Sequence, residues 1–193
     1  MHHIYHTEGI ILGSKNFGEA GRYYSIFTRD LGMIHASAQG VRKMSSKLRF
    51  ILQDFSYVKV DLVQGKNFWR VASASKMNRL EELVKNLGAF QVFSNIAKLL
   101  ERLLAGAEQN EKLFIDLVDG LSVLATTKEA KDLENTEAIL VLRILSNLGY
   151  IGSGRISERL TESPFEKNLI LEAAKVRSQL VRQINQALRE SHL

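Results

Sequence analysis

The sequence predicts an α+β protein in which a small β domain precedes an all-helical domain. Five short runs rich in aromatic and β-branched residues lie within residues 5–75, and such runs are typical of strands. After residue 76 the apolar residues repeat with the 3.6-residue period of helices. We therefore predict two domains, residues 1–77 and 78–193, with the boundary near residues 77–79.

Charge and aromatic content divide the chain at the same point. The first 75 residues hold ten lysine and arginine residues against five acidic ones, whereas the remainder holds 16 of each. Ten of the fifteen aromatic residues also lie in residues 5–76. A basic, aromatic-rich β domain is a pattern found in proteins that bind nucleic acid.

Turn-forming residues separate the expected strands. Asp30-Leu31-Gly32 joins the second strand to the third as a hairpin, and residues 64–67 join the fourth to the fifth. Five strands at this spacing, mostly without helices between them, indicate a small barrel or sandwich. The expected strands cover residues 5–14, 22–28, 33–39, 55–63 and 68–75.

Apolar stripes in the second half predict four helices, over residues 89–105, 111–125, 136–148 and 164–190. The third is apolar nearly all round, so we expect it to be the most buried, and Gly106 and Gly149 are suited to end helices. Ser163 is predicted to cap the last helix, with Pro164 in its first position and Glu166 completing a capping box.

Composition excludes several classes of protein. No cysteine occurs, so disulfides and thiolate zinc sites are excluded, as expected in a reducing cytoplasm. The first residues lack a signal-peptide pattern, and no run of about 18 uncharged apolar residues predicts a membrane span. The sequence pI of about 9.5 favours polyanionic partners.

The leading functional candidate is the basic loop, residues 40–49, which contains four basic residues and no acidic one. Lysine and arginine neutralise phosphates and release counterions. The predicted DNA-binding residues are Arg22, Arg29, Arg42, Lys43, Lys47, Arg49, Lys66 and Arg70. Charge alone equally allows a solvated surface loop.

Four aromatic residues of the β domain have two possible roles. If they face the same groove as the basic residues, they stack on bases; otherwise they fill the core of the barrel, which needs most of its aromatic residues inside. These residues are Phe17, Tyr24, Phe68 and Trp69.

No catalytic, metal or cofactor motif is recognisable, so we expect a protein that is not an enzyme. The five histidines do not form a ligand set at recognisable spacing. Residues 149–154 are glycine-rich, but they follow a helix and lack the Lys-Ser/Thr ending of a phosphate loop. Neither Gly-x-Ser-x-Gly nor His-Glu-x-x-His is present.

Several segments together resemble the bacterial RecO family in order and spacing. The resemblance is carried by residues 17–22 (Phe-Gly-Glu-Ala-Gly-Arg), 27–29 with Gly32, 38–42, 47–49 and 52–55, and more weakly by 143–150. It implies a five-stranded OB-like barrel at the N-terminus and a helical C-terminal domain.

The resemblance also implies a function, that of a recombination mediator in DNA repair. Such a protein binds single- and double-stranded DNA and anneals complementary strands. With its partner RecR, it loads RecA onto DNA coated by single-strand-binding protein, whose C-terminal tail is a second expected partner. The expected location is cytoplasmic, at the nucleoid when DNA is bound.

Three departures from the family pattern stand out. Gly21 occupies the position before Arg22 where the family usually has aspartate, the four cysteines of the zinc site that many family members carry are missing, and the chain is short for the family. Without zinc, we expect the turn over residues 152–163 to be held by packing and by the Ser163 cap.

Two alternatives of other classes stay open. One is a protein-interaction module, with an OB platform and helical docking surface, that has little DNA binding of its own. The other is an OB protein that binds RNA.

Overall fold

A computed structural model describes residues 3–66, 68–77, 80–104, 108–152 and 155–190. The chain divides into two compact units. The first comprises residues 1–81 and 97–111, and the second comprises residues 82–96 and 112–193. Each unit is described by itself.

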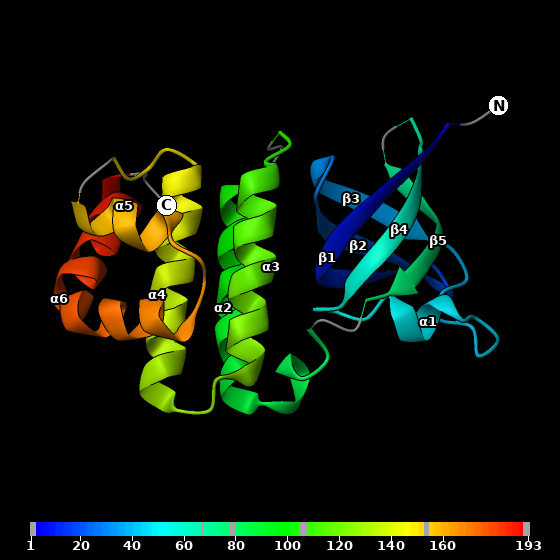
Figure 1. The fold of residues 1–193 in the computed structure, drawn as a ribbon. Helices are drawn as coiled ribbons and strands as arrows, with labels where there is room; N and C mark the ends of the chain where they lie inside the picture. Colours follow the sequence, from blue (N-terminus) through cyan, green and yellow to red (C-terminus); the bar gives the residue numbers. More distant parts are fainter. Residues whose placement is uncertain (1–2, 67, 78–79, 105–107, 153–154, 191–193) are drawn as a thin grey trace. The chain divides into compact units, whose positions relative to one another are not determined.

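Five strands of the first unit close into a barrel in the order β1-β2-β3-β5-β4 (Figure 1). β3 and β5 pair in parallel, and the other pairs are antiparallel. A helical turn, α1, connects β3 to β4. This is the topology of an OB-like barrel, and it confirms the predicted fold class. The elements are β1 (Ile4–Phe17), β2 (Gly21–Thr28), β3 (Gly32–Ala38), α1 (Leu48–Ile51), β4 (Tyr57–Gln64) and β5 (Trp69–Lys76).

Alternation along β2 shows how the barrel is filled. Successive side chains of a strand point to opposite faces, so Tyr24 and Ile26 lie on one face and are 1% and 0% exposed. Both belong to a core cluster that includes Val41 and Leu52 from the connection between β3 and β4. Arg22 shares their face one step nearer the strand end, which places it at the mouth of the barrel.

The strand prediction is wrong at residues 15–17. Lys15, Asn16 and Phe17 were expected in a loop, but they continue β1 by pairing with the first residues of β2. All three residues are exposed, so they lack the alternation of buried and exposed positions that predicts a strand. The predicted loop 40–49 is likewise replaced at its end by α1.

The helical elements are η2 (Leu83–Lys85), α2 (Leu87–Leu103), α3 (Glu111–Thr126), α4 (Ala130–Asn147), α5 (Arg155–Glu162) and α6 (Lys167–Glu190) (Figure 1). α4 begins six residues before the predicted start. Thr136, which looks like a helix start, bonds its hydroxyl back to the Asp132 carbonyl within the helix, at 2.7 Å. Residues 130–135 are mostly polar, so the apolar pattern used to predict the helix does not extend over them.

The predicted end of α4 is confirmed. Gly149 has φ of 79°, the left-handed conformation that glycine adopts without strain. The Tyr150 N–H donates to the Leu145 carbonyl at 2.8 Å and the Gly149 N–H to the Ser146 carbonyl at 3.0 Å. These two bonds form a Schellman motif, which satisfies carbonyls at the helix end. Gly106 lies outside the described residues.

The predicted Ser163 cap is wrong, and so is the expectation of a turn over residues 152–163. Residues 155–162 form α5, and α6 starts only at Lys167, after the carbonyl of Glu166 accepts its first bonds. The carbonyl of Ser163 instead accepts a hydrogen bond from the Arg143 guanidinium.

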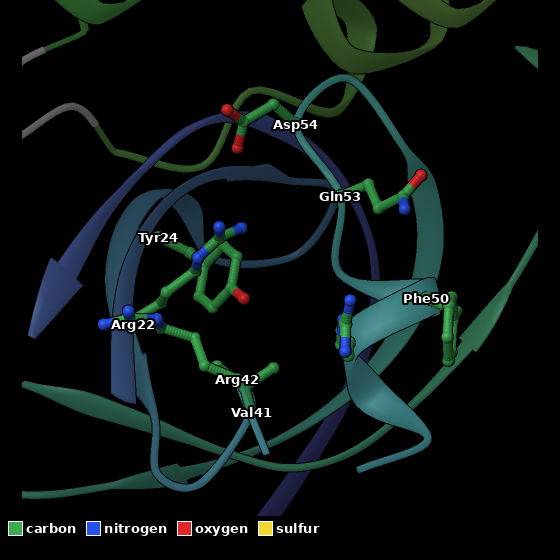
Figure 2. Close-up of a pocket in the computed structure, with 8 residues that line it drawn as sticks. Arg22, Tyr24, Val41, Arg42, Phe50, Gln53 and Asp54 are labelled. Carbon is green, nitrogen blue, oxygen red and sulfur yellow. The ribbon is translucent and has the colours of Figure 1, made fainter. Parts of the chain in front are cut away.

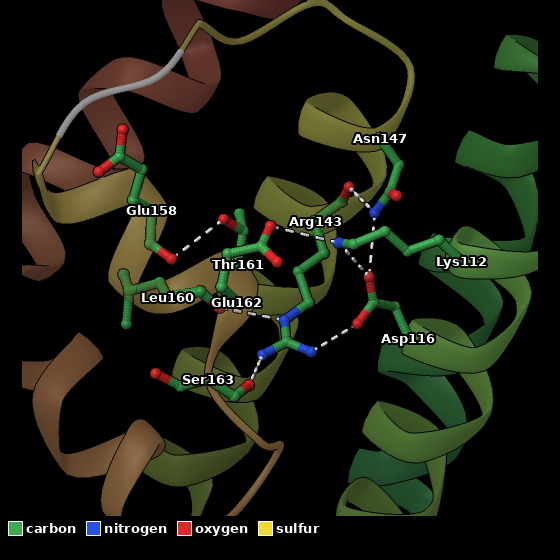
Figure 3. A network of polar contacts seen from close by, with 9 residues as sticks. All are labelled: Lys112, Asp116, Arg143, Asn147, Glu158, Leu160, Thr161, Glu162 and Ser163. Carbon is green, nitrogen blue, oxygen red and sulfur yellow. Dashed lines mark hydrogen bonds and ion pairs between the residues drawn. The ribbon is translucent and has the colours of Figure 1, made fainter.

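A buried arginine holds α5 and the connection to α6 against α3 and α4 (Figure 3). Arg143 is 4% exposed, and its Nη1 lies 2.6 Å from the Asp116 carboxylate. Its Nε donates to the Leu160 carbonyl at 3.0 Å, and its guanidinium lies over the Phe165 ring at 4.8 Å. One side chain therefore links three helices where packing and a cap were expected.

Two structural absences apply to the described part of the chain. No group of three or more histidine, aspartate or glutamate residues there is arranged to hold a metal ion. Within the same ranges, no helix combines the length and the apolar character needed to cross a membrane.

Candidate nucleic-acid interface

A pocket of about 450 Å³ opens at the mouth of the barrel (Figure 2). Three of the predicted DNA-binding residues converge on it from separate elements: Arg22 from β2, Arg42 from the loop after β3, and Arg49 from α1. Its other lining residues are Tyr24, Val41, Phe50, Gln53 and Asp54.

Local structure fixes each arginine. The Asn16 amide oxygen accepts a hydrogen bond from the Arg22 Nε at 3.2 Å, across the β1–β2 pair. The backbone N–H of Arg42 donates to the Ala20 carbonyl at 2.9 Å, which ties the basic loop to the β1–β2 turn. Gly40, with φ of 66°, provides the left-handed bend that starts this loop. α1 is anchored by Leu52, which follows it and lies in the core.

Glycine at position 21 is explained by its surroundings. A Cβ there would lie 2.9 Å from the Phe17 carbonyl oxygen and 3.0 Å from the Phe17 ring. An aspartate side chain at this position would require the Phe17 backbone or ring to shift in the pairing of β1 and β2. Arg22 consequently has no carboxylate beside it in sequence.

The hydroxyl of Tyr24 forms the floor of the pocket. Figure 2 shows it pointing into the space between Arg22, Arg42 and the helical turn that carries Phe50. Tyr24 is 1% exposed, and its hydroxyl has no hydrogen-bond partner in the described structure. Burial raises the pKa of this hydroxyl above 10.0, while the charge of Arg22 and the interaction of its side chain with the hydroxyl act in the opposite direction. The group therefore stays protonated and available as a donor.

The charge of the pocket is positive. Asp54 is the single carboxylate among the lining residues, and none of the three arginines forms an ion pair with a carboxylate within the described ranges. The Nη1 of Arg49 contacts the Met44 sulfur at 3.1 Å, and its guanidinium lies 5.5 Å from the Phe50 ring centre. Guanidinium groups without acidic partners are suited to bind phosphate oxygens.

An aromatic group lies on the outer face of the barrel at the same strand ends. Ring centres are 4.6 Å apart for Phe17 and Tyr23, and 5.5 Å apart for Tyr23 and Phe68. Phe17 is 43% exposed and Phe68 is 51% exposed. Exposed rings next to basic residues provide surfaces on which bases stack. We call Phe17, Tyr23 and Phe68 the aromatic platform.

The four aromatic residues singled out from the sequence thus divide. Phe17 and Phe68 are on the platform, whereas Tyr24 belongs to the core cluster. Trp69 is half-buried and packs edge-on against Tyr5, with ring centres 5.0 Å apart. Tyr23, which the sequence interpretation did not select, completes the platform. Its place next to Tyr24 in a strand was the available signal, because neighbours in a strand point to opposite faces.

Arg29 lies apart from the pocket. It follows the far end of β2, seven residues beyond Arg22 and roughly 20 Å along an extended strand. Its Nη2 lies 2.5 Å from the Glu111 carboxylate, and this contact raises the pKa of Arg29. The described structure does not bring Arg29 together with the other predicted site residues.

The remaining predicted residues are exposed and do not line the pocket. Lys43 and Lys47 lie in the basic loop between Arg42 and Arg49, so they add charge near the mouth. Lys66 is in the turn before β5. Arg70 lines a separate hollow that also includes Leu48 of α1. The candidate interface therefore centres on Arg22, Arg42 and Arg49, which line one pocket.

These features define a class of protein: an OB-like barrel with a basic mouth and a platform of exposed aromatic rings, followed by a helical domain. Residues 1–78 match the family model described as "Recombination protein O N terminal". This match covers the whole barrel.

Curated relatives extend the similarity into the helices. The chain is 31% identical over 147 residues to the DNA repair protein RecO of Heliobacterium modesticaldum, covering 76% of this chain and 52% of that protein. It is 29% identical over 147 residues to the RecO of Pelotomaculum thermopropionicum, covering 76% of this chain and 56% of the relative. The chain belongs to the RecO family of DNA repair and recombination proteins. It spans about half the length of the curated relatives it matches.

Proposed function

We propose that the protein is a recombination mediator that binds single- and double-stranded DNA through the barrel mouth. The observation that carries this proposal is the convergence of Arg22, Arg42 and Arg49 at the strand ends that bear the aromatic platform, with no acidic partner for these arginines among the described residues. Guanidinium groups neutralise phosphates, and exposed rings accept stacked bases from any sequence. Membership of the RecO family supports the assignment to DNA repair.

The proposed mechanism is electrostatic and needs no catalytic group or cofactor. Two DNA strands repel each other through their phosphates. A basic surface that holds both strands lowers this repulsion and lets complementary bases pair. We further propose that, with RecR, the protein supports loading of RecA onto DNA coated by single-strand-binding protein, and that it associates with the nucleoid when DNA is bound.

Binding of labelled single-stranded DNA, measured by fluorescence anisotropy over a series of salt concentrations, tests the interface. For the wild type we expect log K to fall with log salt at a slope of about −0.7 per phosphate contacted. Replacing Arg22, Arg42 and Arg49 together with alanine should flatten the slope by about 2. Arg29→Ala is the matched control, since Arg29 is paired with Glu111 at the other end of β2.

The outcomes separate the proposal from its alternatives. Loss of slope only in the triple variant supports the DNA interface, and an annealing assay then tests the mediator role. Absence of DNA binding at low salt refutes the proposed DNA interface and favours a protein-interaction module. Pull-down with RecR and with the tail of single-strand-binding protein would identify such a module. Preference for RNA over a DNA strand of matched sequence favours the RNA-binding alternative.

A further inference from the structure

The pocket at the barrel mouth has a composition that mid-strand phosphate binding does not require. Contacts to an internal phosphodiester need only exposed cations along a groove. Here three guanidiniums surround a concavity whose floor is Tyr24, a residue that is 1% exposed and whose hydroxyl has no hydrogen-bond partner by geometry in the described structure. Buried polar groups are nearly always paired, so an unpaired one that points into a cavity is available as a donor to whatever occupies that cavity.

The charges and donors define which ligand suits this cavity. The lining has three positive groups and one negative group, so it complements an anion of about two charges. An internal phosphodiester has one negative charge, two free oxygens and a chain continuing on both sides. A terminal phosphate has three free oxygens and a charge of about −1.5 to −2 at neutral pH. With a chain on only one side, it enters a concave site end-on.

We propose that this pocket holds the terminal phosphate of a DNA strand, with Tyr24 donating to one oxygen and Arg22, Arg42 and Arg49 to the others. The inference rests on the proposed function and adds to it a preference for phosphorylated strand ends. The platform lies at the same strand ends as Arg22, because Phe17 pairs with Gly21 and Asn16 pairs with Arg22. The first unpaired bases then stack on the platform while the end phosphate enters the pocket.

The free hydroxyl of Tyr24 gives this proposal a selective test. An unpaired buried hydroxyl destabilises the empty protein, so Tyr24→Phe should leave the denaturation midpoint unchanged or raise it. The same change removes one charge-assisted hydrogen bond to a bound end phosphate. A group with a purely structural role would not show this combination, because its removal would lower stability.

Anisotropy titrations of the full chain would use single strands of one sequence in four forms, with a phosphate or a hydroxyl at the 5′ end and likewise at the 3′ end. We expect the phosphorylated form of one end to bind about tenfold more tightly than its hydroxyl form, the factor for one added charge-assisted interaction. The two pairs of strands identify which end is held. Tyr24→Phe should reduce this ratio severalfold and leave the affinity for hydroxyl-ended strands unchanged.

Lys43→Ala serves as the control, because Lys43 is exposed and lies outside the pocket. It should weaken binding of all four strands alike and keep the ratio. Equal affinity of the wild type for phosphate and hydroxyl forms at both ends overturns the inference while leaving the DNA interface intact. Failure of every strand to bind overturns the proposed function and this inference with it. An unchanged ratio in Tyr24→Phe excludes Tyr24 as the donor and also overturns the proposal.

Discussion

Replacing Arg143 by methionine tests the account of the helical unit. Methionine keeps much of the length and the helix propensity of arginine but removes the charge and every donor. The change leaves the carboxylate of Asp116, which is 13% exposed, without its arginine, and leaves the carbonyls of Leu160 and Ser163 without this donor. It also removes the contact of the guanidinium with the Phe165 ring.

The magnitude follows from burial. Breaking a buried ion pair by removing one partner costs about 3–5 kcal/mol, because the remaining charge stays desolvated. Asp116 retains two other contacts, with the Asn147 amide at 3.0 Å and the Lys112 ammonium at 3.3 Å. These keep the carboxylate partly compensated, so we expect a loss of about 3 kcal/mol in the free energy of unfolding, at the lower end of the range. Such a loss is a large fraction of the stability of an ordinary domain.

Urea denaturation followed by far-ultraviolet circular dichroism measures this loss, and amide hydrogen exchange in α5 locates it. Arg159→Met is the matched control: the same substitution, in an ion pair of similar length (2.5 Å to Glu172), but with 69% of the arginine side chain exposed. That variant should lose at most about 1 kcal/mol. Equal losses in the two variants, or a loss below about 1 kcal/mol for Arg143→Met, would refute the argument from burial.

Three further predictions address the core, the hairpin and a surface carboxylate. Ile144, 1% exposed in α4, should cost about 2–5 kcal/mol when changed to alanine, and an unchanged denaturation midpoint would mean that it is not in the core. Gly21→Ala should lower stability by about 1–3 kcal/mol in the same assay, because its Cβ meets the Phe17 backbone; a more stable variant would contradict this. Hydrogen bonds from Ser73 and then His6 lower the pKa of Asp61 below 3.8, so Ser73→Ala should raise it, as carboxyl NMR would show. Because the folded pKa is depressed, Asp61 stabilises the fold above the unfolded pKa and loses this contribution as pH falls through the folded value. An unchanged Asp61 titration would count against the Ser73 bond.

The sequence by itself determined the class of fold and the basic character of the β domain. The period of the apolar residues, two in strands and 3.6 in helices, reflects which face of an element is buried, and this period can be read from neighbouring residues in the sequence. The end of α4 at Gly149 was also predictable from the local sequence, since a helix end in the left-handed conformation favours glycine whatever surrounds it.

The tertiary structure alone decided the site and the anchoring of the helices. Arg22, Arg42 and Arg49 converge because closure of the barrel brings β2, the basic loop and α1 together, while Arg29 goes to the other end of the same strand. Strand alternation separates Tyr23 from Tyr24, but only closure determines which of the two is inside. The local sequence predicts Ser163 as a helix cap, but in the structure its carbonyl accepts a hydrogen bond from Arg143, twenty residues earlier. In each case the deciding contact joins residues distant in sequence, and no local pattern encodes such a contact.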